Sequence, residues 1–287
     1  MLRAIPRPRR PETVRKREAV WILKKVWGAS MFLAIDIGNT NITLGLYDGA
    51  TLGPRWRAAT GHEKTADEYG CLMRSFFRRA GVADAEVRAV AMASVVPPLT
   101  ATFQEACERY FHCKPLVVDA AIRTGIRILY EDASQVGADR IVDAAACYTL
   151  YGGPACIVDF GTATTFDAIS SEGEYLGGAI APGIGIAAEA LFHRAAKLPK
   201  VDIVRPPAAI GKNTAHSLQS GLLFGYVGLV EGMVERFKAE LGPGTRVIAT
   251  GGLAEIISKE TTVLSTVAPW LTLDGLRIIH DLNNPGT

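Results

Sequence analysis

The hydrophobic pattern of this chain contains two stretches that are near copies of each other, residues 32–47 and 156–168. Each begins with an apolar run that ends in aspartate, continues through one residue to glycine and a few hydroxyl or amide residues, and becomes apolar again. Short apolar runs bounded by glycine are typical of buried strands. Each stretch therefore predicts a β-hairpin with a polar turn, and the shared spacing favours a duplicated fold over two ordinary, unrelated hairpins.

The rest of the chain alternates between helical and strand-like periods. Apolar spacing predicts helices over residues 66–80, 99–111, 141–151 and 216–240. Short apolar runs predict strands over residues 87–96, 115–118 and 246–250. Strands that alternate with helices indicate an α/β fold with parallel strands.

One segment, residues 175–192, is apolar enough to raise the question of a membrane span. It contains several glycines, Pro182 and Glu189, which argue instead for a buried strand, turn and helix. Within it, Gly183, Gly185 and Ala188 match a dinucleotide-binding pattern, but a single match of this kind is a weak signal. We therefore expect neither a membrane span nor a dinucleotide site here.

Length and composition predict a globular chain of two domains. The chain has 287 residues, of which 48% are hydrophobic and 21% charged, so it can bury a large core. We expect one domain over 31–150 and a second over 151–287. The five cysteines form no C-x-x-C pair, and the five histidines show no metal-ligand spacing, so a reducing, cytoplasmic compartment is expected.

Charge separates the first thirty residues from the rest. Residues 1–30 contain nine Lys/Arg and two Asp/Glu, a net charge of +7, whereas the remainder contains 22 and 27, a net charge of −5. A mildly acidic body argues against nucleic-acid binding by the folded part. A transit peptide or a nucleic-acid-binding arm remains possible for the leader, but we expect an extension that contributes nothing to the fold, with the domain starting at Met31.

The two hairpin turns carry the chemistry expected of a phosphate clamp. Glycine at 38 and 161 permits a tight turn in which backbone N–H groups face phosphate oxygens. Asp36 ends the first strand, where a carboxylate can hold a hydrated Mg²⁺ that bridges those phosphates. Two such turns facing each other would bind a nucleoside triphosphate.

A second polar constellation precedes the helix expected from residue 141. It consists of Gly137, Ala138, Asp139 and Arg140, and Asp143 follows one helical turn after Asp139. Asp139 alone is well explained as an N-cap, because an acid near a helix N-terminus is favourable. Arg140 offers a planar fork suited to a carboxylate.

In this order, the motifs Asp36-Ile-Gly38-Asn39-Thr40, Gly137-Ala138-Asp139-Arg140, Asp159-Phe-Gly161-Thr162-Ala163-Thr164-Thr165 and Gly177-Gly178…Pro182-Gly183 closely resemble those of the type III pantothenate kinases. The resemblance extends from Met31 to about Asn283 and leaves only the leader unexplained. It implies a duplicated actin-like (ribonuclease H-like) ATPase fold of the sugar-kinase type, with the active site between two domains. It also implies ATP-dependent phosphorylation of pantothenate, the first step of coenzyme A synthesis.

The resemblance further implies roles for individual residues. The first phosphate loop binds ATP together with Thr162, and it comprises Asp36, Ile37, Gly38, Asn39, Thr40, Asn41, Ile42 and Thr43. Asp139 is the catalytic base. Pantothenate is held by Tyr130, Gly137, Ala138, Asp139, Arg140 and Thr214. Asp159 binds a monovalent cation, K⁺ or NH₄⁺, while Mg²⁺ is held at Asp36 through the phosphates. The family is expected to form homodimers with the substrate pocket near the subunit interface, without nucleic-acid or membrane partners.

Two other functions remain open on the sequence alone. A kinase of another small hydroxylated substrate, such as a sugar, would carry the same phosphate machinery. A catalytically silent regulatory protein would keep the fold, but the intact Asp36, Asp139 and Asp159 argue against it.

Overall fold

The computed structural model describes residues 30–195 and 197–285. Its strands form two mixed sheets. The first contains β1 (Met31–Ile37), β2 (Asn41–Asp48), β3 (Thr51–Ala59), β4 (Val87–Ser94) and β5 (Leu116–Val117). The second contains β6 (Arg127–Ile128), β7 (Ala155–Phe160), β8 (Ala163–Ile169), β9 (Glu174–Pro182), β10 (Arg246–Gly251) and β11 (Thr266–Val267).

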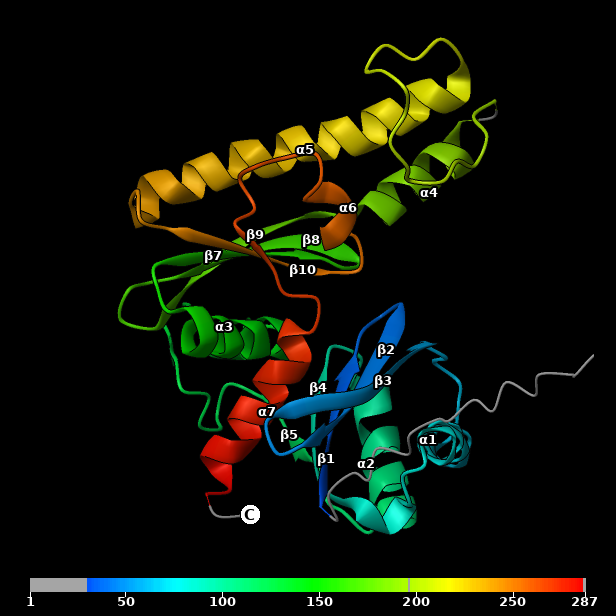
Figure 1. Ribbon diagram of the computed structural model, residues 1–287, viewed down its shortest axis with the longest axis vertical. Coiled ribbons are helices and arrows are strands. Elements are labelled where there is room, and N and C mark those ends of the chain that lie inside the picture. The colour runs from blue at the N-terminus through cyan, green and yellow to red at the C-terminus, as the bar shows by residue number, and fades with distance from the viewer. Residues whose placement is uncertain (1–29, 196, 286–287) are drawn as a thin grey trace, which may run out of the picture.

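The two sheets repeat one strand order (Figure 1). The first sheet is ordered β3-β2-β1-β4-β5, and the second is β9-β8-β7-β10-β11 with β6 added beside β9. In both, three consecutive strands pair antiparallel, a fourth strand pairs parallel to the first of them, and a short fifth strand pairs parallel to the fourth. This repetition agrees with the duplication predicted from the two hairpins.

Helices cover both sheets and separate them. They are α1 (Ala66–Ala80), α2 (Pro97–Phe111), α3 (Ala138–Tyr151), α4 (Ile184–Arg194), α5 (Thr214–Leu241), α6 (Ala254–Ile257) and α7 (Leu271–Asn283). Single 3₁₀ turns lie at Asp84–Glu86 and Ala133–Gln135. Helices α1 and α2 pack on the outer face of the first sheet, and α5 and α6 pack on the second. Helices α3 and α7 lie between the two sheets (Figure 1).

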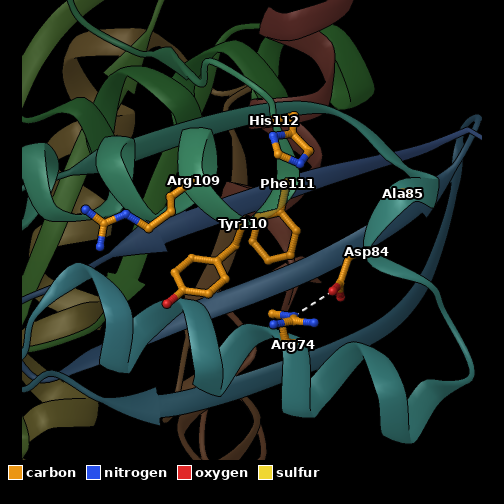
Figure 2. A pocket seen from close by; sticks show the side chains of 7 residues that line it. All are labelled: Arg74, Asp84, Ala85, Arg109, Tyr110, Phe111 and His112. Carbon is orange, nitrogen blue, oxygen red and sulfur yellow. Dashed lines mark hydrogen bonds and ion pairs between the residues drawn. The ribbon is translucent and has the colours of Figure 1, made fainter.

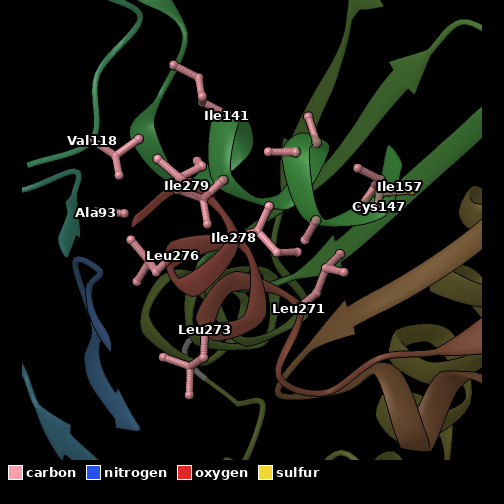
Figure 3. Packing of buried hydrophobic residues seen from close by; sticks show 14 of the residues in the cluster. Ala93, Val118, Ile141, Cys147, Ile157, Leu271, Leu273, Leu276, Ile278 and Ile279 are labelled. Atoms are coloured by element: carbon pink, nitrogen blue, oxygen red, sulfur yellow. The ribbon is translucent and has the colours of Figure 1, made fainter. Parts of the chain in front are cut away.

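One hydrophobic core joins the two halves of the chain (Figure 3). It takes Phe32 and Tyr47 from the first sheet, Ile157 and Ile169 from the second, and the apolar faces of α3 and α7. The helices approach so closely that a Cβ at Gly275 of α7 would clash with the backbone of α3. A glycine is therefore required at this crossing.

The chain crosses between the sheets at two places. The short strand β6 pairs with β9 although it precedes α3, and α7 returns from the second half to pack against α3 and β1. The division into 31–150 and 151–287 stays a prediction. The leader lies almost wholly outside the described residues.

Most of the predicted elements are confirmed, with corrections at their ends. The helix predicted over 66–80 matches α1, which has a capping box between Thr65 and Glu68 and ends at Gly81 with φ 74°. Helix α2 begins at Pro97, not at residue 99, because proline suits the first helical turn. Helix α3 begins at residue 138, not at 141.

The stretch 175–192 forms a strand, a turn and a helix, as predicted. In the part of the chain that the structure describes, no helix is both long and apolar enough to cross a membrane. Strand β3 and helix α7 were not predicted from the sequence.

Candidate active site

The two predicted phosphate turns face each other. The hydroxyl oxygens of Thr40 and Thr162 lie 2.8 Å apart, although the residues are 122 positions apart in the chain. Of the predicted first loop, Asp36 and Ile37 end β1, residues 38–40 form the turn, and residues 41–43 begin β2. The turn is closed by a hydrogen bond from the Gly38 amide to the Asn41 carbonyl, 3.0 Å. The fold therefore brings together the two halves of the predicted clamp.

Three aspartates that are far apart in the chain gather at these turns. Asp36 lies near the end of β1, Asp159 near the end of β7, and Asp139 in the first turn of α3. Burial raises the pKa of Asp36 to about 8, with further contributions from the charges of Asp139 and Asp159. Burial raises the pKa of Asp159 to about 7, and the charge of Asp139 adds to it. Because the charge of each carboxylate acts on the pKa of its neighbours, we place the three together in one site, hereafter the aspartate site.

Asp139 is not the N-cap of α3. The cap position belongs to Gly137, and Ala138 is the first helical residue. Asp139 Oδ1 accepts a hydrogen bond from the backbone N–H of Arg140, 2.8 Å. Burial nevertheless raises its pKa above the usual range. A carboxylate with a raised pKa is a stronger base than an ordinary one, which suits proton abstraction.

A fourth carboxylate lies one turn further along α3. Asp143 is 4% exposed, and its Oδ1 has no hydrogen-bond partner among the described residues. Burial raises its pKa well above the usual value, and the charge of Asp159 adds to this. The sequence predicted that Asp143 lies on the same helix face as Asp139. In the structure the charges of Asp159, Asp139 and Asp36 all act on Asp143, so it belongs to the same group of carboxylates.

Arg140, which follows Asp139 in α3, and Tyr130 both lie against Tyr175. The Arg140 guanidinium lies 5.8 Å from the ring centre of Tyr175, and the rings of Tyr130 and Tyr175 are 6.3 Å apart. Arg140 Nε also donates to Asp167 Oδ1 at 2.8 Å. Asp167 and Tyr175 were not among the site residues predicted from the sequence. The signal was present in β8, where Thr165 and Asp167 place polar side chains on one strand face.

Arg57 of β3 is another residue that the sequence analysis missed. It pairs with Thr43 in the sheet, and its positive charge partly offsets the raised pKa of Asp36. Its Nη1 lies 3.5 Å from the position that a Cβ at Gly252 would take. It makes no hydrogen bond or ion pair with the residues that the structure describes. A cation is thus available beside the first phosphate turn.

The glycines after β10 close the site from the second sheet. Gly251 has φ 89°, and a side chain there would clash with the carboxylate of Asp159. The backbone after β10 therefore passes close to Asp159.

The chain matches the sequence pattern described as "Type III pantothenate kinase" over residues 32–236, which is more than half of its length. A type III pantothenate kinase from Moorella thermoacetica is 53% identical over 253 residues, which cover 88% of this chain and all of that protein. The corresponding protein from Myxococcus xanthus is 50% identical over 254 residues, 88% of this chain and 99% of that protein.

The chain belongs to the type III pantothenate kinase family. Solved structures agree on the fold. A protein from Campylobacter jejuni described as a Baf family transcriptional activator has a TM-score of 0.57 and 20% identity, and covers 88% of this chain and 98% of its own. The ethanolamine utilization protein EutJ from Carboxydothermus hydrogenoformans has a TM-score of 0.52 and 13% identity, with 86% and 89% covered. The two mixed sheets and these neighbours confirm the predicted actin-like fold.

One predicted substrate residue of this pantothenate kinase family member lies apart from the others. Thr214 is the exposed first residue of α5, at the end of that helix far from α3 in Figure 1. Within the described residues, no hydrogen bond or ion pair connects it to the aspartate site. The role of Thr214 in holding the substrate stays a prediction.

The predicted cation sites at Asp36 and Asp159 can be compared with the side chains that the structure places around them. Among residues 30–195 and 197–285, no group of three or more His, Cys, Asp or Glu side chains is arranged as a dedicated metal cage. Mg²⁺ in kinases needs only one or two carboxylates, with water and substrate phosphates completing its shell. Asp36 and Asp159 fit such binding, because a cation would relieve the repulsion that raises their pKa values.

A separate cavity in this kinase family member, of about 440 Å³, lies between α1, α2 and the 3₁₀ turn before β4 (Figure 2). Its floor carries an ion pair between Arg74 Nε and Asp84 Oδ2, 2.6 Å long. It contains none of the predicted site residues and is formed on the outer helices of the first sheet. We assign the chemistry to the aspartate site and not to this cavity.

Proposed function

We propose that the protein transfers the γ-phosphate of ATP to the primary hydroxyl of pantothenate, giving 4′-phosphopantothenate, the first step of coenzyme A biosynthesis. The observation that carries this proposal is the meeting of Asp36, Asp139 and Asp159 between two facing phosphate turns in a chain of this family. Phosphoryl transfer requires mainly positioning and charge neutralisation, and this site offers donors, carboxylates and a cation for both.

Each residue has a distinct task in the proposed reaction. The backbone of the first turn and Thr162 bind the ATP phosphates, and Arg57 neutralises charge beside them. Asp139 removes the proton from the pantothenate hydroxyl as its oxygen attacks the γ-phosphorus, and the bond to the β-phosphate oxygen breaks to release ADP. A positioned base of this kind contributes about 10²–10⁴ in rate.

Two cations are proposed for the site. Mg²⁺ would be held by Asp36 and the phosphates, where it would neutralise charge that develops during transfer. K⁺ or NH₄⁺ would be held by Asp159. Support comes from the raised pKa values of both carboxylates, since each would exchange a bound proton for a cation.

We also propose a homodimer in which Thr214 of the partner subunit completes the substrate pocket. Thr214 lies apart from the pocket of its own chain. Large apolar side chains are exposed on β9 and α4, including Ile180, Ile186 and Phe192. A Cβ at Gly221, Gly225 or Gly228 of α5 would meet nothing within 4 Å, so this helix leaves room for close packing by a second copy.

A cytoplasmic location is proposed on the evidence of the cysteines. All five are described by the structure and all are free thiols. Unpaired cysteines are typical of reducing compartments.

The test is ATP-dependent phosphorylation of pantothenate by the purified full-length chain with Mg²⁺ and either K⁺ or Na⁺. Turnover that requires K⁺ is the expected result. Equal rates in the two salts would contradict the role of Asp159. Absence of turnover with ATP still bound would refute pantothenate as the acceptor, and a panel of sugars and other small alcohols would then distinguish another kinase from a silent regulatory protein.

A further inference from the structure

The guanidinium of Arg140 is held from one side by a buried acid. Asp167 has a side chain that is 2% exposed, and that of Arg140 is 11% exposed. Arg140 Nε donates to Asp167 Oδ1 at 2.8 Å, and Nη2 lies 2.7 Å from the same oxygen. Such an arrangement fixes the plane of the guanidinium, because two of its nitrogens contact one oxygen atom.

Two further hydroxyls fix Asp167 itself. Tyr175 donates to Oδ1 at 2.7 Å, and the Thr165 hydroxyl donates to Oδ2 at 3.2 Å. Tyr175 also lies beneath the guanidinium of Arg140. The acid and the ring together leave the arginine little freedom to rotate.

The other edge of Arg140 remains available to a ligand. Its Nη1 makes no hydrogen bond or ion pair with the described residues, whereas the buried Nη2 is in contact with Asp167 Oδ1 alone, without good hydrogen-bond geometry. A donor left without a partner on a side chain that is only 11% exposed is costly, so the Nη1 hydrogens are available to a group that binds there. A carboxylate is the group that best matches a guanidinium fork.

We propose that Asp167 and Tyr175 are positioning residues that orient Arg140 so that its free edge binds the carboxylate of the substrate. This inference rests on the proposed function, in which the substrate is pantothenate. Asp167 does not touch the substrate and acts only through the arginine. The pair thereby determines specificity for an acid over its neutral analogues.

The experiment compares two substrates that differ only at this group, pantothenate and pantothenyl alcohol, in which a hydroxymethyl group replaces the carboxylate. We expect Asp167→Asn to raise KM for pantothenate about 10- to 100-fold, as for loss of a hydrogen bond to a charged group. KM for pantothenyl alcohol and KM for ATP should stay within about 2-fold of the wild-type values, since neither depends on the oriented fork. Tyr175→Phe removes one hydroxyl and keeps the ring, and should show the same selectivity with a rise of about 3- to 10-fold.

Glu174→Gln is the matched control, because Glu174 pairs with Arg127 on the neighbouring strand and makes no hydrogen bond or ion pair with Arg140 or Asp167 among the described residues. It should change KM for neither substrate. Equal rises for both substrates in the Asp167 and Tyr175 variants would overturn the positioning role and leave the proposed function standing, as would unchanged KM values. If Asp167→Asn does not fold, the Tyr175→Phe comparison decides by the same criteria. A wild-type chain that phosphorylates neither substrate would refute the proposed function itself.

Discussion

The buried carboxylate of Asp36 should lower the free energy of unfolding at high pH. Comparing the wild type with Asp36→Asn measures the size of this loss. In the unfolded chain Asp36 loses its proton near pH 3.8, whereas in the folded protein it holds the proton up to about pH 8. The folded state therefore binds more protons between these values, and its stability falls as pH rises through this window. Replacing the acid by an amide of the same shape removes that loss.

The magnitude follows from the shift. Each unit of pKa difference corresponds to about 1.4 kcal/mol, so the wild-type protein should lose up to about 4 kcal/mol between pH 5 and pH 8 relative to the variant. Ions and water that enter the site stabilise the charged carboxylate and so reduce this loss of unfolding free energy. We expect a gain of at least about 1 kcal/mol at pH 8, which is about 2–4 °C in Tm for a chain of this size.

The assay is thermal unfolding at pH 5 and pH 8 in chelator, without nucleotide. Asp36→Asn should be more stable than the wild type at pH 8, similar to it at pH 5, and inactive with Mg·ATP. Asp202→Asn, which changes an exposed acid, should show no pH-dependent gap. Adding Mg·ATP should stabilise the wild type and not the Asp36 variant. A variant that is no more stable than the wild type at pH 8 would refute the reasoning.

Three other predictions concern separate parts of the molecule. Arg57→Gln should lower kcat by about 10²-fold or more, as for loss of a group that stabilises transition-state charge, while Arg55→Gln, whose guanidinium lies 4.7 Å over Trp270, should not; steady-state rates decide, and equal effects would exclude a special role for Arg57. Gly275→Ala should cost about 1–3 kcal/mol in unfolding free energy by overpacking the α3–α7 crossing, whereas Gly244→Ala, where a Cβ meets nothing within 4 Å, should be near neutral; denaturant titration would contradict this by ranking them equally. A thiol reagent at pH 8 should modify the exposed Cys71 quickly. It should spare the three buried cysteines Cys107, Cys147 and Cys156, because burial raises the pKa of each thiol to about 12. Fast reaction of more than two thiols in the folded protein would disprove this.

The sequence predicted best those features that depend on local pattern. Helix α1 was located to the residue from its apolar spacing, and its capping box and the αL glycine at its end agree with that pattern. The two hairpins were found because they repeat, and the repeat then implied their facing arrangement. The pairing of Thr40 with Thr162 confirms it.

What the sequence could not predict depends on contacts between distant segments. Helix α7 was missed, since its apolar face is recognisable as such only when α3 lies against it. Asp167 and Tyr175 looked like ordinary strand residues, and their relation to Arg140 arises from the pairing of β8 with β9 and the position of α3. Arg57 was missed for the same reason, because its neighbours Asp36 and Gly252 come from opposite ends of the chain.

The position of α7 also determines when this protein can become folded during its synthesis. The first strand begins at Met31, but the helix that covers its inner face begins only at Leu271. At about 5–20 residues per second, a ribosome needs roughly 10–50 s to make the intervening chain. During that time the apolar side chains of Phe32 and Tyr47 lack their final cover, so the nascent chain needs protection from aggregation until its last helix emerges.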